Sequence, residues 1–139
     1  MSHVFQTLMD RRVVLGAFGF KTDLRRPFMR CVQFTTHLRS RYLHLPYGDQ
    51  ALFLRREVFQ GAGGFPEVPI AEDLLLVRRL SSRGRTAIAP AYCITSGRRW
   101  ARGGLLKTSL LNQIILAGLM MGVSPMTLAR LYKGKHEAT

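Results

Sequence analysis

Segments with the apolar spacing of a helix alternate along this chain with short runs of β-branched and aromatic residues, and this alternation limits the possible folds. Helices are predicted at residues 3–9, 27–43, 57–60, 71–83, 105–121 and 125–132. Strands are predicted at residues 13–20, 51–54, 86–89 and 92–95. This order favours an α/β layered architecture in which helices pack on a short mixed sheet and two helices follow at the C-terminal end.

The chain has the length and composition of one soluble globular domain. It contains 139 residues, of which 47% are hydrophobic and 21% charged, so it can bury a core without disulfide bonds. Its two cysteines, Cys31 and Cys93, lack the spacing of a Cys-x-x-Cys motif. We interpret them as reduced thiols in a cytosolic protein.

The strongly basic net charge of the chain indicates that it binds an anionic partner. The formal net charge is +13, and arginines outnumber lysines seventeen to four. Nucleic acid, a nucleotide diphosphate, a phosphorylated acceptor and an anionic membrane surface are the candidate partners. The sequence has no RNA-recognition, helix-turn-helix or zinc-finger signature, which makes nucleic acid the weaker candidate. The four histidines lack the spacing of zinc ligands.

The longest apolar segment, residues 105–123, is too interrupted to span a membrane. Lys107, Asn112 and Gln113 break it, and the uninterrupted part has ten residues. We expect a buried core helix. The alternative is a helix lying on a membrane surface, because basic residues flank the segment on both sides.

The acidic pair Glu72-Asp73 opens the helix predicted at residues 71–83. A carboxylate in that position can accept a proton from a hydroxyl and act as a general base. It can also do no more than complement the helix dipole, and the position alone leaves both interpretations open.

Two further motifs have a functional and a structural interpretation. The glycines before Phe65 lack the Gly-Lys-Ser/Thr of a phosphate-binding loop, so a turn is expected there. Arg98-Arg99-Trp100 can clamp a phosphate and stack on a ring. It can equally be a basic turn in which Trp100 packs on the core.

In combination, the motifs resemble the acceptor-side signature of family 2 glycosyltransferases, which have the GT-A fold. The resemblance lies in the order Gly48, Arg55-Arg56, Phe59, Gly63-Gly64-Phe65, Glu72-Asp73, Leu80 and Gly84. Arg99-Trp100 is similar to the end of the Gln-x-x-Arg-Trp motif of processive members, although Ser96 stands at the Gln position.

A narrower resemblance covers most of the chain. It is to the bacterial subgroup labelled radical-SAM/selenodomain-associated family 2 transferases. The motifs that carry it are Pro46-Tyr47-Gly48-Asp49-Gln50, Thr95-Ser96-Gly97-Arg98-Arg99-Trp100 and the segment from Gly122-Val123-Ser124-Pro125 to Leu128-Ala129-Arg130-Leu131-Tyr132.

The resemblance implies inverting transfer of a sugar from a nucleotide-diphospho-sugar to an acceptor hydroxyl. It implies that Asp73, with Glu72 beside it, is the catalytic base. The residues implied in substrate binding are Gly48, Asp49, Gly63, Gly64, Arg98, Arg99 and Trp100.

A complete GT-A enzyme also has a nucleotide-binding half with an Asp-x-Asp-like motif that holds Mg²⁺ or Mn²⁺. This sequence contains neither the half nor the motif. We therefore expect a single partial domain: an acceptor-side α/β portion at residues 1–104, a helical extension at 105–133 and a tail at 134–139. A chain of this kind is expected to be inactive alone.

Two alternatives to an enzyme remain. One is a non-catalytic basic module that binds nucleic acid or a membrane surface by charge. The other is a folded but inactive remnant. An exposed sheet edge and apolar face would favour self-association or dependence on a partner in that case.

Overall fold

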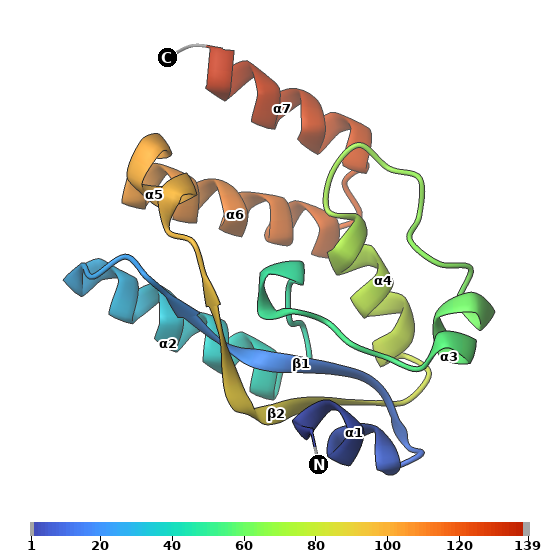
Figure 1. Ribbon diagram of the computed structural model, residues 1–139. Coiled ribbons are helices and arrows are strands. Elements are labelled where there is room, and N and C mark those ends of the chain that lie inside the picture. The colour runs from blue at the N-terminus through green and yellow to red at the C-terminus, as the bar shows by residue number, and fades with distance from the viewer. Residues whose placement is uncertain (1, 138–139) are drawn as a thin grey trace.

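The chain forms a mixed α/β fold in which helices cover a small parallel sheet (Figure 1). This computed structural model describes residues 2–137, except the side chains of residues 99, 103, 105 and 135–137. The helices are α1 (His3–Met9), α2 (Pro27–Tyr42), α3 (Arg56–Gly61), α4 (Glu72–Ser81), α5 (Arg98–Gly103), α6 (Leu105–Met120) and α7 (Pro125–Glu137). The strands are β1 (Val13–Thr22) and β2 (Arg85–Thr95), and η1 (Gly48–Gln50) is a 3-10 turn.

The two strands run parallel, from the pair Val13 and Arg85 to the pair Thr22 and Thr95. The register shifts beside the β2 segment that contains Pro90. Proline has no backbone N–H to give to a ladder, so an irregular position tolerates it. We expected Pro90 to separate two strands, at residues 86–89 and 92–95, and the structure joins them into one.

The main core lies between β1 and the helices on one side of the sheet. Its buried members are Leu15, Leu45, Ala62, Leu74, Leu76, Val77, Leu80, Leu119 and Leu128. Because Leu119 belongs to α6 and Leu128 to α7, the two C-terminal helices share this core with β1 and α4. The helical extension expected at residues 105–133 therefore packs directly on the α/β portion.

Most of the predicted helices agree with the structure to within a few residues. Helix α1 occupies the predicted residues, and α4 has its acidic pair in the first turn and two arginines in the last. The strand predicted at residues 51–54 was wrong. Only Phe53 pairs there, through a single antiparallel bridge with Gly16, because Ala51 adopts a left-handed conformation with φ 50°.

Two other differences concern the C-terminal third. Residues 98–103 form the short helix α5, where the sequence indicated a turn. Helix α7 continues to Glu137, so the tail expected from residue 134 is helical as far as the structure describes it.

Arg55 ties the N-terminal segment to the start of α3. Its guanidinium donates hydrogen bonds to the carbonyls of Leu8, Arg11 and Val13, at 2.9, 3.2 and 2.8 Å. We expect Arg55→Met to lower the free energy of unfolding by about 2 kcal/mol or more, because three carbonyls lose a charged donor. Chemical denaturation measures this loss, and the same change at the exposed neighbour Arg56 should have little effect. Equal losses in both variants would contradict the assignment.

Candidate functional site

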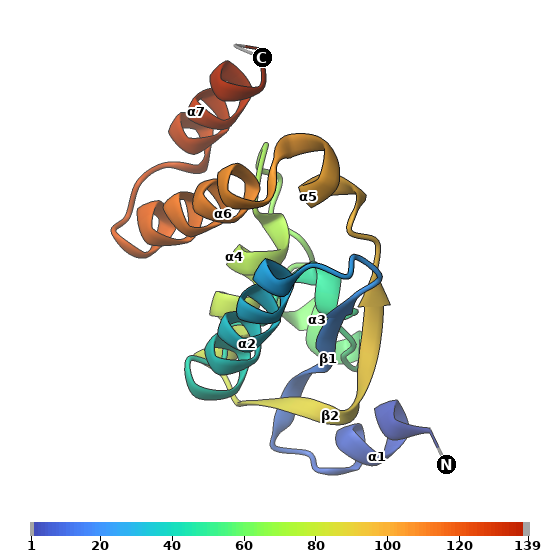
Figure 2. The same cartoon turned by 90° about the vertical axis from the view of Figure 1, so that its left-hand side faces the viewer.

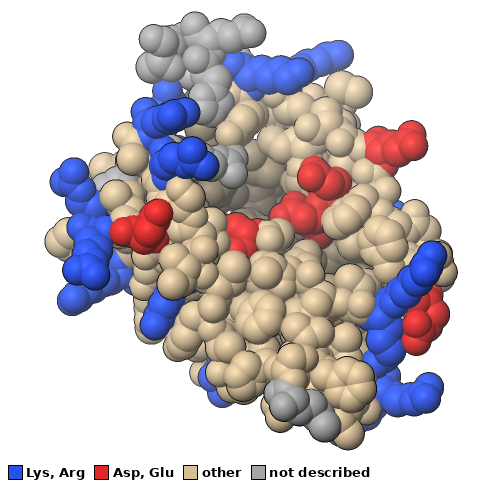
Figure 3. Space-filling view, viewed as in Figure 1, with Lys and Arg blue, Asp and Glu red and all other residues tan. Residues whose placement is uncertain are grey.

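Asp73 lines a small cleft between α4 and α6, with a volume of about 130 Å³. The residues around the cleft are Tyr47, Ile70, Ala71, Asp73, Leu74, Asn112 and Ile115. In the space-filling view of Figure 3, acidic side chains gather beside a hollow near the centre of the molecule. Most basic side chains lie toward its periphery. The cleft therefore presents negative charge within a basic protein.

The Asp73 carboxylate is held by two backbone donors. Its Oδ1 accepts a hydrogen bond from the N–H of Leu74 at 2.8 Å, and its Oδ2 accepts one from the N–H of Gly48 at 2.6 Å. Ala71, the residue before α4, has φ 60° and ψ 34°, and this left-handed conformation sets the direction in which the helix starts. Each carboxylate oxygen keeps a further lone pair, so the group can still accept a proton or a hydroxyl donor.

The approach of Gly48 to Asp73 requires a residue without a side chain. A Cβ atom on Gly48 would lie 2.9 Å from Oδ2 of Asp73 and 3.4 Å from its Cβ. These two predicted site residues are 25 positions apart in the sequence and are brought into direct contact.

A cation and a phenol lie next to this pair. The guanidinium carbon of Arg39 is 3.6 Å from the centre of the Tyr47 ring, and Arg39 Nε donates to the carbonyl of Leu45 at 3.0 Å. Burial lowers the pKa of Arg39, although the carboxylates of Asp49 and Asp73 act in the opposite direction. Burial also raises the pKa of Tyr47. Arg39 thus supplies buried positive charge close to both carboxylates.

The turn that presents Gly48 is anchored by a buried glutamine. Gln50 is 1% exposed, and its Oε1 accepts hydrogen bonds from the hydroxyl of Ser40 at 2.8 Å and from the N–H of Tyr47 at 3.2 Å. Its Nε2 donates to the carbonyl of Phe18 at 3.1 Å. Gln50 therefore connects η1 to both β1 and α2.

Sequence analysis did not identify Arg39, Tyr47, Gln50 or Asn112 as site residues. Tyr47 and Gln50 belong to the same short motif as Gly48, and this neighbourhood is the sequence signal that could have identified them. Arg39 and Asn112 lie in helices that are far from Asp73 in the sequence, and no local pattern marks either residue.

The other two predicted acidic residues lie near Asp73 in the sequence or in the fold, and Gly63 and Gly64 lie elsewhere. Glu72 is exposed beside Asp73, and Asp49 is half-buried in η1, where its carbonyl accepts a hydrogen bond from Thr95 at 2.8 Å. Gly63 and Gly64 have φ of 83° and 69° in the loop after α3. Within the described part of the chain, the residues that line the Asp73 cleft do not include these two glycines.

The predicted Arg-Arg-Trp motif forms the start of α5. Arg98 is exposed, and its Nε donates to the hydroxyl of Ser96 at 3.2 Å. The side chain of Arg99 lies outside the described residues. Trp100 is 5% exposed and packs against Phe20, with ring centres 5.9 Å apart. Burial of Trp100 matches the interpretation in which its ring packs on the core.

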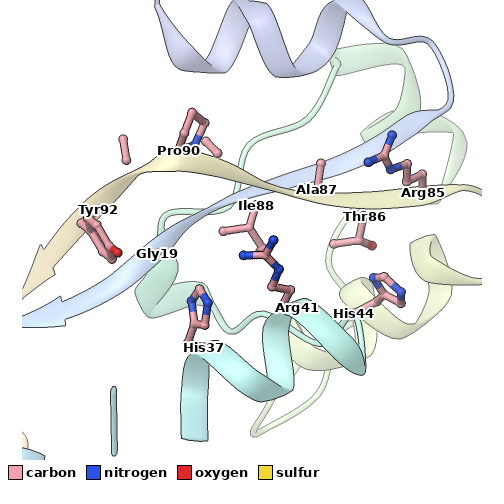
Figure 4. Close-up of a pocket in the computed structure, with 12 residues that line it drawn as sticks. Gly19, His37, Arg41, His44, Arg85, Thr86, Ala87, Ile88, Pro90 and Tyr92 are labelled. Atoms are coloured by element: carbon pink, nitrogen blue, oxygen red, sulfur yellow. The ribbon is translucent and has the colours of Figure 1, made fainter. Parts of the chain in front are cut away.

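A second, larger cleft lies between α2 and β2 and has a volume of about 600 Å³. Figure 4 shows His37 and Arg41 on α2 and His44 in the loop after it, with Ile88 and Thr86 of β2 opposite them. His37 and Arg41 are four positions apart and share one face of α2, whereas His44 lies beyond the end of the helix with φ 55°. The spacing of His37 and Arg41 was visible in the sequence, but the cleft depends on the position of β2.

The described residues contain no group of three or more His, Cys, Asp or Glu side chains that could hold a metal ion. Comparisons with profiles of known protein families, with curated proteins and with solved structures found no match. The chain is a mixed α/β protein of basic net charge with a cleft that is lined by the carboxylate of Asp73.

Substitution of Gly48 tests the close contact with Asp73. We expect Gly48→Ala to lower the free energy of unfolding by about 1–2 kcal/mol, because the new methyl group displaces the carboxylate from its backbone donor. The matched variant Gly61→Ala introduces a methyl group where nothing lies within 4 Å. It should be neutral or stabilising by up to about 1 kcal/mol. Thermal denaturation of both variants measures the difference, and a neutral Gly48→Ala would contradict the geometry.

Proposed function

We propose that this chain carries the acceptor side and the catalytic base of a GT-A glycosyltransferase of family 2. The observation that carries the proposal is the Asp73 carboxylate, fixed at the Asp73 cleft by the Gly48 N–H at 2.6 Å. Both residues belong to the ordered motifs that resemble this family. A fixed carboxylate with free lone pairs, in a cleft the size of a small hydroxyl-bearing group, suits a general base.

In the proposed reaction, Asp73 takes the proton from an acceptor hydroxyl. The hydroxyl oxygen attacks the anomeric carbon of the nucleotide sugar, and the bond from that carbon to the diphosphate breaks with its electron pair. The attack comes from the face opposite the leaving group and inverts the configuration. Asp49 and Glu72 flank the acceptor, and the Arg98-Arg99 pair offers positive charge to the departing diphosphate.

The reaction requires a donor-binding half supplied by a further polypeptide segment. A divalent cation is expected in that complete enzyme. The carboxylates described in this chain do not form a three-ligand group. The metal ligands would therefore come from the donor half.

Acceptor binding can be tested on this chain alone. The backbone amide resonances of Gly48 and Asn112 should shift on titration with a panel of simple sugars, amino sugars and polyols, since both residues border the Asp73 carboxylate. Gly61, on the exposed end of α3, provides the internal control. Selective and saturable shifts support acceptor binding. If the whole panel leaves Gly48 unmoved, the proposal fails at its first step.

The second candidate function is a non-catalytic module for anions, and the large cleft between α2 and β2 favours it. His37, Arg41 and His44 direct three basic side chains into that cleft. Titration with nucleic acid at increasing salt separates the two functions. Tight binding that weakens steeply with salt supports the module, whereas an acceptor-binding domain should bind nucleic acid weakly.

We further propose a cytoplasmic location, with peripheral contact at the inner membrane face. The support is that Cys31 and Cys93 are free thiols. None of the described helices is long and apolar enough to cross a bilayer. Self-association, or pairing with the donor half, is the further partner expected for the exposed edge of β2.

A further inference from the structure

An apolar groove runs between α2 and α6, on the face that Figure 2 turns toward the viewer. Its volume is about 460 Å³. The residues that line it are Phe28, Cys31, Val32, Thr35, Arg39, Leu43, Leu106, Ser109, Leu110, Gln113 and Leu116. Tyr42 and Leu38 extend the same surface along α2. We call this surface the α2–α6 groove.

The large side chains of the α2–α6 groove are unusually exposed. Leu106 is 72% exposed, Leu110 61% and Tyr42 69%. Phe34, three residues after Cys31 and four before Leu38 on α2, is 65% exposed. Helix α6 carries apolar residues on all sides, a pattern typical of a helix that is covered all round. The rest of the fold covers only part of the surface of α6, and an exposed apolar surface of this kind typically marks an interaction site.

The charge around the groove identifies the chemistry of the partner that binds there. Residues 24–48 and 74–136 contain no aspartate or glutamate, so α2, α5 and α6 carry no acidic side chain. Arg39 lines the groove, and Arg98 and Arg102 are exposed on α5, which packs against α6. An apolar surface between helices that carry basic but no acidic side chains is complementary to a surface that combines apolar chains with negative headgroups.

We propose that the α2–α6 groove is a docking surface for an anionic lipid bilayer. The apolar side chains of α2 and α6 enter the headgroup region, and Arg98 and Arg102 of α5 reach the lipid phosphates. A second copy of the chain fits this surface less well, because helices with basic and no acidic side chains would repel each other. The proposal does not depend on the glycosyltransferase activity.

Docking of this kind would also place the Asp73 cleft close to the membrane. Helix α6 contributes Leu106 and Leu110 to the groove and Asn112 and Ile115 to the cleft. One helix therefore separates lipid from the candidate base.

Cosedimentation of the chain with lipid vesicles tests the proposal. We expect binding to vesicles of phosphatidylglycerol and phosphatidylcholine, and little binding to phosphatidylcholine alone. Salt should weaken the binding without abolishing it, because the apolar contacts are not screened. Phe34→Ser and Leu110→Ser should each lower the partition coefficient by about tenfold, since each removes a large apolar side chain from the contact.

Phe5→Ser is the matched control, because Phe5 lies on α1 at the far end of the molecule and is 61% exposed. It should bind vesicles like the unchanged protein, and circular dichroism should show all three variants folded. Failure to bind the anionic vesicles overturns the proposal. So does equal binding by all variants, which would mean adsorption by charge alone. A dimer in sedimentation velocity that Leu110→Ser dissociates would also overturn it, in favour of a second copy.

Discussion

Asp73→Asn is expected to reduce sugar transfer by roughly 10²–10⁴-fold in the complete enzyme, that is, this chain joined to its donor-binding half. Asparagine keeps the size of the side chain but cannot accept the acceptor's proton. Its amide oxygen can still accept one of the two backbone hydrogen bonds, from Gly48 or Leu74, that the carboxylate accepts. The fold should therefore survive with a modest loss of stability.

The measurement is acceptor-dependent release of nucleoside diphosphate from a panel of nucleotide sugars. Glu57→Gln is the matched control: Glu57 is an exposed carboxylate in the first turn of α3, so it removes the same charge from a similar position in another helix. Its transfer rate should equal that of the unchanged enzyme. Transfer that persists in Asp73→Asn would exclude Asp73 as the base and leave Glu72 or Asp49 to be considered.

Gln50→Leu is expected to lower the free energy of unfolding by about 2–4 kcal/mol. The change leaves the Tyr47 N–H and the Phe18 carbonyl without their partner in the core, while the Ser40 hydroxyl keeps the Thr36 carbonyl as an acceptor and Leu fills a similar volume. Unsatisfied buried polar groups cost more than the hydrogen bonds themselves contribute.

Urea denaturation of Gln50→Leu and of Gln60→Leu measures this effect. Gln60 is exposed on α3, so the same substitution there should change stability by less than about 0.5 kcal/mol. Because η1 carries Gly48, Gln50→Leu should also weaken the Gly48 amide shift on acceptor titration. A stable Gln50→Leu variant with normal acceptor binding would show that η1 is held by other contacts.

The helices were largely predictable because their signals are local. Pro27 at the first position of α2, the acidic pair at the start of α4 and Pro125 at the start of α7 each act within one helical turn. The position of Asp73 at a helix start followed from the same signals. The single strand β2 was not predictable, because its continuity through Pro90 depends on the register with β1.

The sequence by itself determined the α/β alternation, the helix starts and the basic charge, since these depend on residues a few positions apart or on composition alone. Only the tertiary structure decided that Gly48 meets Asp73, that Gln50 joins β1 to α2 and that α2 lies beside α6. These contacts join segments far apart in the chain. Their geometry follows from how the whole core packs, so no local pattern encodes it.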